Sequence, residues 1–530
     1  MESRTQVVVA GGGPVGLSAA VELGRRGIRT LVIEPRQVVS HARPRCKTVN
    51  VRTMEHLRRW GVADELRRRA LLPPSWSQDV VFCTSLVGRE LSRFTGVLGL
   101  VSEGDRFPEL GQQAPQYLLE EMLRDTVSSL PTCTLITGSM VLDVEQDEDE
   151  VRVLVADEHG VRSTVAADFL LGCDGPRSVV RERIGAAYEG EHALRPNFGM
   201  VFSAPQLWAH VGHGPAVHYW VVNAAAPALM GPLDRTGTWW IIAFGVDRAT
   251  GERDAQAIID AAAGMQVDAQ VLSTDPWTAR MQIVDRMRDR QVFLAGDSAH
   301  LNPPFGGHGL NTGIGDAVDL GWKIAAVLDG WGGPALLDSY EVERRPIQLR
   351  VIREATANMQ VTSPELLSPH LDDDTAEGHA ARRAADARIQ QTKDAEFHAL
   401  DLVLDVDVEN SPVISRHPTR VERSAGAIPG HRLPHRWLSV DRSLYDELGH
   451  GLTLLLLAAN PAAAAIERAA RDRNVPLKIV DLRGRGFRHD YGADLVLVRP
   501  DQYVAWRGDE APADVGSLLD VVRGAARSSS

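Results

Sequence analysis

The sequence has few cysteines, no long apolar run and no excess of positive charge. Only four cysteines occur among 530 residues, at positions 46, 83, 133 and 173, and no two are spaced as CxxC. This argues against a zinc site and against a disulfide framework. No run of about 18 apolar residues is present to span a bilayer. We therefore expect no bound metal and no membrane partner.

The charge balance and the length narrow the class of protein further. The 57 basic and 70 acidic residues give a net charge of −13, which repels phosphate polymers and predicts no nucleic-acid partner. The first residues lack the basic and apolar segments of a secretory signal, so we expect a cytoplasmic protein. A chain of 530 residues exceeds one ordinary core, which predicts two or three domains.

The first 34 residues have the pattern of a strand, a tight turn, a helix and a second strand. The turn carries a GxGxxG spacing formed by Gly11, Gly13 and Gly16, with Pro14 and Val15 between the last two. Such glycines let the backbone approach a pyrophosphate, which the helix N-terminus faces. Glu34 is placed to bind ribose hydroxyls and disfavours a 2′-phosphate, which favours FAD or NAD over NADP. This motif alone does not separate FAD from NAD, and a glycine turn that serves only packing is the alternative.

Two later stretches also place polar residues and glycines after a strand, where a nucleotide cofactor could bind. The segment "DFLLGCDGPRSVVR", residues 168–181, reads as a strand that ends in a turn at Asp174 and Gly175. In residues 291–330, a strand delivers Gly296 and Asp297 to a loop rich in proline and glycine. Asp297 is suited to accept a hydrogen bond from a sugar-like hydroxyl.

A helix is predicted from near Leu310, directly after that loop. Glycines at 306, 307 and 309 permit close approach of the backbone to a flat ring. The backbone amides of Leu310 and Asn311, at the helix N-terminus, are suited to stabilise negative charge on the pyrimidine edge of a flavin. The loop therefore favours a flavin as the bound group.

The ordered set of motifs resembles the group A flavoprotein monooxygenases typified by para-hydroxybenzoate hydroxylase and phenol hydroxylase. The resemblance rests on the GxGxxG turn, on "CDG" at 173–175, and on "GDSAH" at 296–300 with "PPFGG" and "LNTG" behind it. The stretches "RPRCKTVNVRTMEHLRRWG" at 43–61 and "QYLLEEMLRD" at 116–125 also resemble family segments near the flavin. The resemblance covers nearly the whole chain and implies FAD as cofactor, with NAD(P)H and O2 as co-substrates.

The resemblance also implies roles for individual residues. Glu34 is expected at the adenosine ribose, and Arg45 and Gln116 at the flavin or its chain. Asp297 is expected at the ribityl or diphosphate region, and Asp174 is associated with both FAD and NAD(P)H. The Pro304 carbonyl is expected to face a substrate hydroxyl, so that Pro304 and Arg45 are the predicted catalytic residues. The predicted cofactor-binding residues are Gly11, Gly13, Pro14, Val15, Gly16, Glu34, Arg45, Gln116, Asp174, Asp297, Gly307, Gly309, Leu310 and Asn311.

The predicted architecture is α/β, with a Rossmann-like FAD-binding domain interrupted by a β-sheet substrate domain. The FAD-binding domain is expected at 1–180 and 280–350, the substrate domain at 181–279 and a helical segment at 351–410. Residues 411–530 have a βαβ…ββα pattern that resembles the thioredoxin-like tail of phenol-hydroxylase-type members. This tail contains no cysteine, which excludes dithiol chemistry.

The implied reaction is hydroxylation of a phenolic or polycyclic aromatic through a flavin C4a-hydroperoxide, in natural-product tailoring such as antibiotic biosynthesis or in aromatic catabolism. The predicted substrate-contacting residues are Trp220, Met230, Trp239, Pro304 and Phe305. His213, His218 and Tyr219 are candidates for the base that deprotonates a phenol. A flavin-bound protein that only sequesters an aromatic intermediate is the alternative. A flavin halogenase is less favoured, because "WWII" at 239–242 does not match the family's spaced Trp-x-Trp-x-Ile-Pro stretch.

The segment expected to cover the substrate ring is poor in positive charge. No lysine or arginine occurs from Pro196 to Asp234, the segment expected to cover the ring. A buried carboxylate needs a charged partner, so this absence predicts a largely uncharged aromatic substrate. The partner is thus a small aromatic molecule, and a homodimer is a candidate assembly.

Overall fold

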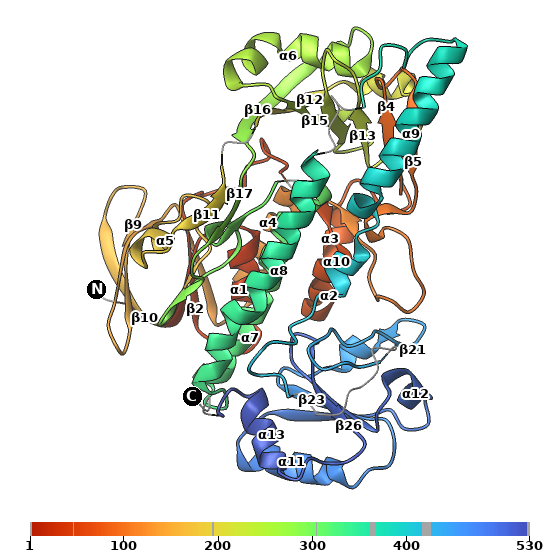
Figure 1. Ribbon diagram of the computed structural model, residues 1–530. Helices are drawn as coiled ribbons and strands as arrows, with labels where there is room; N and C mark the ends of the chain where they lie inside the picture. Colours follow the sequence, from red (N-terminus) through yellow and green to blue (C-terminus); the bar gives the residue numbers. More distant parts are fainter. Residues whose placement is uncertain are drawn as a thin grey trace.

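The computed structural model describes residues 3–45, 47–192, 195–303, 305–360, 366–415 and 426–526, with only the backbone at Ser3, Phe305, Met359 and Gln360. The described chain forms a first sheet near its N-terminus, a second sheet beside it and a third in the C-terminal tail (Figure 1). In Figure 1 the second sheet and the tail lie at opposite ends of the molecule. Within the described ranges, no helix combines the length and the apolar character needed to cross a membrane.

The first sheet is built around the strand that precedes the glycine turn. Its main path runs β18-β19-β10-β1-β2-β7, with β8 and β9 attached as a hairpin through β10. Strand β1 pairs in parallel with β2 and β10, β2 with β7, and β10 with β19. The strands are β1 Ser3–Ala10, β2 Thr30–Glu34, β7 Cys133–Thr137, β8 Met140–Gln146, β9 Val151–Ala156, β10 Arg162–Gly172, β18 Arg288–Asp289 and β19 Val292–Leu294. The carboxyl ends of β1, β2, β10 and β19 therefore meet at one edge of the sheet, where ligands bind in such folds.

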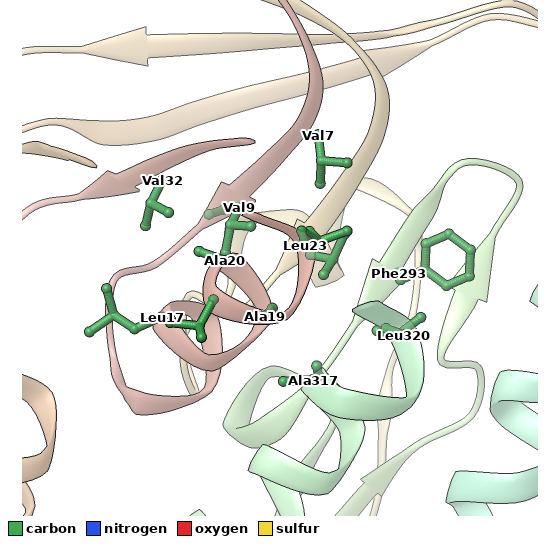
Figure 2. Packing of buried hydrophobic residues seen from close by; sticks show 14 of the residues in the cluster. Val7, Val9, Leu17, Ala19, Ala20, Leu23, Val32, Phe293, Ala317 and Leu320 are labelled. Carbon is green, nitrogen blue, oxygen red and sulfur yellow. The ribbon is translucent and has the colours of Figure 1, made fainter. Parts of the chain in front are cut away.

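Two helices that are far apart in the sequence pack together against this sheet. Helix α1, Pro14–Gly24, follows β1, and helix α7, His308–Leu328, follows β19 and the loop after it. Figure 2 shows Ala20 of α1 beside Val9 of β1, and Ala19 on the side of α1 that faces Ala317 of α7. A Cβ atom on Gly321 would lie 2.5 Å from Glu22 Cγ, so the two helices approach too closely for a larger side chain there. This packing places the N-termini of both helices at the same edge of the sheet.

The second sheet has the order β16-β12-β15-β14-β13-β4-β5. Its strands are β4 Val80–Cys83, β5 Glu90–Phe94, β12 Pro196–Ser203, β13 His218–Val221, β14 Ala228–Pro232, β15 Thr238–Phe244 and β16 Gln270–Thr278. Helix α6, Arg248–Ala263, covers one face, and helix α9, Ala376–Phe397, lies against the other. Strand β4 pairs in parallel with β13, although residues 80–94 fall inside the range predicted for the FAD-binding domain. The expected boundary is wrong for this segment, because a hairpin donated by the first 180 residues completes the second sheet.

The C-terminal tail has the element order predicted from its sequence. Its sheet runs β24-β23-β25-β26, with β23 and β24 parallel and the other pairs antiparallel. The elements are β23 Leu452–Leu456, α11 Ala462–Asp472, β24 Leu477–Asp481, β25 Leu495–Val498, β26 Val504–Gly508 and α13 Val515–Val522. Helix α8, Pro334–Gln360, begins well before residue 351, so the predicted helical segment starts too late.

A buried cluster of charges joins the tail to helices α7 and α8. Arg499 lies between three carboxylates: it donates to both oxygens of Glu343, at 2.7 and 2.8 Å, and to Asp319 and Asp501. Lys323 donates to Asp319 and Glu343, each at 2.8 Å. These carboxylates are close enough together to suit a cation, and here Arg499 and Lys323 supply the positive charge. Burial raises the pKa of Asp319, and the nearby Lys323 and Arg499 oppose this effect.

We expect Arg499→Met to destabilise the tail strongly. Removing the guanidinium leaves buried carboxylates without their main partner, which costs on the order of 3–5 kcal/mol. Urea unfolding followed by tryptophan fluorescence measures this change. Arg471→Met is the matched control, because Arg471 pairs with Glu467 on the exposed face of α11 and such a pair contributes under about 1 kcal/mol. Equal shifts in the two variants would contradict the role given to the buried cluster.

Candidate active site

A large cavity opens at the carboxyl edge of the first sheet and extends beneath the second sheet. Its volume is about 1170 Å3. One end is lined by the turn after β1, the end of β2 and the segment after β10. The other end is lined by apolar side chains of β12–β15 and by the C-terminal end of α9. The loop between β19 and α7 lies along the cavity between these ends.

The glycine turn shapes the first end of the cavity. Gly11 has a φ of 102°, and a Cβ there would lie 2.3 Å from the Cys173 carbonyl oxygen. A Cβ on Gly16 would lie 2.0 Å from the Gly11 carbonyl oxygen, so this glycine allows helix and turn to pack. Gly13 has no atom within 4 Å of its Cβ position, and its backbone lines the cavity. This open cradle at the N-terminus of α1 fits a pyrophosphate.

Glu34 ends β2 beside this cradle. Its Oε2 accepts a hydrogen bond from the Gly12 N–H at 2.7 Å, and its Oε1 accepts from Arg36 Nε at 2.6 Å. Arg36 is itself held by Glu120 of α4, Gln116–Ser129, at 2.7 Å. The carboxylate is 3 % exposed and lines the cavity, as a ribose-binding group must. The sequence did not reveal the arginine that fixes it.

The second and third motifs meet the first at the same edge. Asp174 accepts hydrogen bonds from Ser178 Oγ at 2.5 Å and from the Val180 N–H at 3.2 Å, which caps the short helix α5, Val179–Arg183. Burial raises the pKa of Asp174 and likewise that of Asp297, and for Asp297 nearby His300 and Arg45 oppose the effect of burial. Both aspartates line the cavity.

Asp316 of α7 holds the Asp297 loop in place. Its carboxylate is fully buried and accepts from the Gly296 N–H at 3.1 Å, Arg344 Nε at 2.8 Å and Gln348 Nε2 at 3.1 Å. His300 Nε2 lies 2.7 Å from the same carboxylate. Burial favours the neutral acid, but Arg344 and His300 outweigh it and lower the pKa of Asp316 to about 2. The sequence analysis did not single out Asp316, because helical spacing alone does not show what an acidic residue contacts.

The start of α7 is arranged for a flat ring. Gly307, Gly309 and Leu310 line the cavity, and the Cβ position of Gly309 has no atom within 4 Å. Asn311 does not line this cavity. Its side chain instead accepts from the Asn50 N–H at 3.0 Å and donates to the Gly307 carbonyl at 2.7 Å, which ties α7 to the segment before α2, Val51–Trp60.

The predicted cofactor-binding residues thus gather in one place. Those that line the cavity are Gly11, Gly13, Pro14, Val15, Glu34, Arg45, Gln116, Asp174, Asp297, Gly307, Gly309 and Leu310. Gly16 and Asn311 do not line the cavity, but they stabilise the packing of α1 and α7, which do. Pro304 lies outside the described residues, and of Phe305 only the backbone is described.

Three of the predicted substrate-contacting residues do not line this cavity. Met230 and Trp239 lie in the core between the second sheet and α6, because side chains alternate across a strand and these two face away from the cavity. Trp220 is on the cavity face but is buried against Phe82, with ring centroids 5.4 Å apart, and does not reach the cavity. The neighbour of Trp239, Trp240, does line it.

The charge expectation also needs correction. The segment from Pro196 to Asp234 contributes no basic side chain, but the cavity has basic residues from other parts of the chain. They are Arg36, Arg43, Arg45, Lys47, Arg177 and Arg280. The absence of charge in one segment therefore does not describe the cavity, and the argument for an uncharged substrate fails.

A glycine cradle, a ribose-type carboxylate and a glycine-lined helix start on one α/β edge define a dinucleotide-binding protein, and the space beyond the helix start suits a flavin ring. The comparisons with known proteins identify the family. Residues 4–355 match the FAD binding domain model, and residues 426–526 match the aromatic-ring hydroxylase C-terminal model. A putative polyketide hydroxylase of Streptomyces halstedii is 32% identical, with 96% of this chain and 95% of the relative covered.

Two solved structures of flavin-binding proteins are similar to this chain over nearly its whole length. The rebeccamycin biosynthetic enzyme RebC with reduced flavin is similar with a TM-score of 0.92 and 34% identity, over 99% of this chain and 100% of that one. Aklavinone-11 hydroxylase in complex with FAD and aklavinone has a TM-score of 0.81 and 28% identity, over 99% and 100%. The chain belongs to the family of FAD-dependent aromatic-ring monooxygenases. The predictions of family, α/β fold, enzymatic class and FAD as cofactor are confirmed.

We expect Gly13→Ala to weaken FAD binding without disturbing the fold. The added methyl group meets no protein atom, and its position in the cradle is where the pyrophosphate must approach. The expected loss of affinity is at least about tenfold, equivalent to about 1.4 kcal/mol. Fluorescence titration of the FAD-free protein with FAD measures it, and thermal unfolding without FAD checks the fold.

Gly212→Ala is the matched control, because its Cβ position is equally free of neighbours and lies outside the cavity. Unchanged FAD affinity in Gly13→Ala, or an equal loss in both variants, would show that the pyrophosphate binds elsewhere.

Proposed function

We propose that this enzyme hydroxylates a polycyclic aromatic ring that bears a phenolic hydroxyl, with FAD, NAD(P)H and O2. The observation that carries the proposal is the continuity of the cavity from the glycine turn to the apolar face of the second sheet. Its volume of about 1170 Å3 exceeds the roughly 300–1,000 Å3 typical of sites for one small ligand. The space therefore supports a dinucleotide and a fused-ring substrate together. The similarity to a polyketide hydroxylase and to an aklavinone complex favours natural-product tailoring over catabolism of small phenols.

The residues around the cavity suggest how FAD is held. Glu34 is proposed to bind the adenosine ribose, and Gly13 with the N-terminus of α1 to face the pyrophosphate. Asp297 is proposed to bind the chain, and Gly309 and Leu310 to lie against the ring. Bound FAD would supply the redox chemistry, by which the two electrons of NAD(P)H reduce O2 so that one oxygen atom enters the substrate and the other leaves as water. Arg45, which lines the cavity, is proposed to lie beside the reacting ring, and the role expected for Pro304 stays a prediction.

The second sheet is proposed to exclude water from the reaction. Its cavity face is largely apolar and includes the buried side chains of Val201, Val217, Leu233 and Trp240. Such a surface binds an aromatic ring by burial of apolar area and keeps the site dry. The protein contributes orientation and dryness, and the redox chemistry comes from the cofactor.

Steady-state oxidation of NAD(P)H under 18O2 tests this function. The protein is loaded with FAD and offered a neutral hydroxyanthraquinone and, separately, a small hydroxybenzoate. We expect one 18O atom in the anthraquinone product, with little hydrogen peroxide released. Ligand binding without any NAD(P)H oxidation would instead support a protein that sequesters its ligand, and a halogenated product with chloride present would support a halogenase.

We also expect two adjacent tryptophans to behave differently. Trp240→Phe shortens a side chain that lines the cavity, so KM should rise roughly fivefold, and peroxide release should increase, for a contact worth about 1 kcal/mol. Trp239→Phe alters the core on the opposite face and should lower stability by about 0.5–3 kcal/mol, with KM and coupling unchanged. Kinetics and thermal unfolding of both variants provide the comparison. Loss of coupling in Trp239→Phe alone would show that the substrate binds on the face of the sheet that packs against α6, which would contradict the proposed site.

A further inference from the structure

Two nitrogen-bearing side chains lie at the apolar end of the cavity. Lys47, just before β3, Thr48–Val49, places its Nζ 3.9 Å from the centroid of the Trp240 ring. His218, the first residue of β13, has its ring centroid 6.3 Å from that of Trp240 and 5.9 Å from that of Phe397. All four residues line the cavity. A lysine and a histidine thus share the wall that is proposed to cover the substrate ring.

Of the three base candidates in the sequence, the structure brings only His218 to the cavity. The His213 ring nitrogen Nε2 lies 3.1 Å from the Ser85 carbonyl, and the Tyr219 hydroxyl donates to the Gly214 carbonyl at 2.5 Å. Both side chains are therefore occupied elsewhere. His218 Nε2 is buried and finds no hydrogen-bond partner among the described residues. A buried polar nitrogen without a partner is costly unless a ligand or water satisfies it.

Charged side chains from two other segments act on His218. Lys47 comes from the segment before β3, and Lys393 and Glu396 come from α9. Lys393 donates to Glu396 at 2.8 Å and to the Asn358 carbonyl at 2.6 Å, so its charge is largely balanced by that carboxylate. Burial first, and then the two ammonium groups, lower the pKa of His218 to about 3. The imidazole is therefore neutral at physiological pH and does not retain a proton taken from a phenol.

We propose that Lys47 and His218 form a binding site for the oxygen of an aromatic hydroxyl group in its ionised, phenolate form. Lys47 supplies the opposite charge, with its Nζ against the Trp240 ring, and a partly desolvated pair of charges attracts more strongly than a pair in water. Neutral His218 donates a ring N–H to the oxygen. The hydroxyl O–H bond breaks and its proton leaves to solvent, while no other covalent bond changes. This inference rests on the proposed function, for which a phenolate ring is the more electron-rich reactant.

Both residues are assigned to positioning and ionising the substrate, and the assignment identifies the substrate feature that the enzyme selects. An aromatic ring that bears no ionisable hydroxyl cannot supply the anionic oxygen proposed to bind the Lys47 ammonium group.

The test uses a hydroxyanthraquinone whose phenolate absorbs at longer wavelength than oxidised flavin. The FAD-loaded protein is titrated with this dye across pH without NAD(P)H, so that no turnover is needed. We expect the bound dye to ionise at a pH about 1–3 units below that of the free dye, because a nearby cation favours the anion. Lys47→Met should move the ionisation of the bound dye back up by most of that amount, whereas Lys47→Arg should retain it.

His218→Phe should weaken dye binding by roughly 10–150-fold, the value of one hydrogen bond to a charged group. Lys478→Met is the control for loss of a lysine, because Lys478 is in the C-terminal tail and paired weakly with Glu447 at 3.8 Å. The flavin content of each variant confirms that it is folded.

Absence of dye binding, or the same ionisation in the wild-type protein and Lys47→Met, would overturn the proposal. A matching shift in Lys478→Met would do so as well. The outcome is separate from that of the proposed function: a bound phenolate without hydroxylation refutes the function alone, and coupled hydroxylation with an un-ionised bound dye refutes this site alone.

Discussion

The buried carboxylate of Asp316 is the interaction on which the candidate site depends most. It joins the loop that carries Asp297 to α7 and α8 through the Gly296 N–H, His300, Arg344 and Gln348. A buried anion with this many donors is stable only while all of them are present. The position of the loop along the cavity and the position of the α7 N-terminus are therefore fixed together.

The same helices connect the site to the C-terminal tail. Arg344, which binds Asp316, follows Glu343, which binds Arg499 of the tail. Arg344 also donates to the Thr312 carbonyl in the first turns of α7 at 3.0 Å. The tail lacks cysteine and has no residue among those that line the cavity in the described part of the chain. Its physical contribution is to complete a charge cluster behind the helix that the flavin ring is proposed to face.

The sequence was sufficient for the motifs that depend on local backbone geometry. Gly13 and Glu34 occupy the places that the strand-turn-helix-strand pattern predicts, and the tail has the predicted order of elements. It was insufficient where the answer depends on which face of a strand is covered. Trp239 and Trp240 are equivalent in the sequence, but only one lines the cavity, and neither composition nor periodicity shows which.

Contacts between residues that are far apart in the chain could not be predicted from the sequence either. Lys47, His218 and Glu396 come from three distant segments, and only the tertiary fold brings them to one wall. The hairpin of β4 and β5 shows the same limit, since its pairing with β13 spans more than a hundred residues. A single sequence contains no signal for such a contact, because each strand is compatible with many partners.

The central claim is that one cavity holds FAD and an aromatic substrate, with the hydroxyl of the substrate at Lys47 and His218. A crystal structure of the oxidised protein with FAD and a hydroxyanthraquinone tests this directly. The account predicts the adenosine ribose at Glu34, the flavin ring against Gly309 and Leu310, and the dye beneath Trp240 with its oxygen within hydrogen-bonding distance of Lys47 Nζ. A dye bound outside this cavity, or a flavin ring located away from the start of α7, would contradict it.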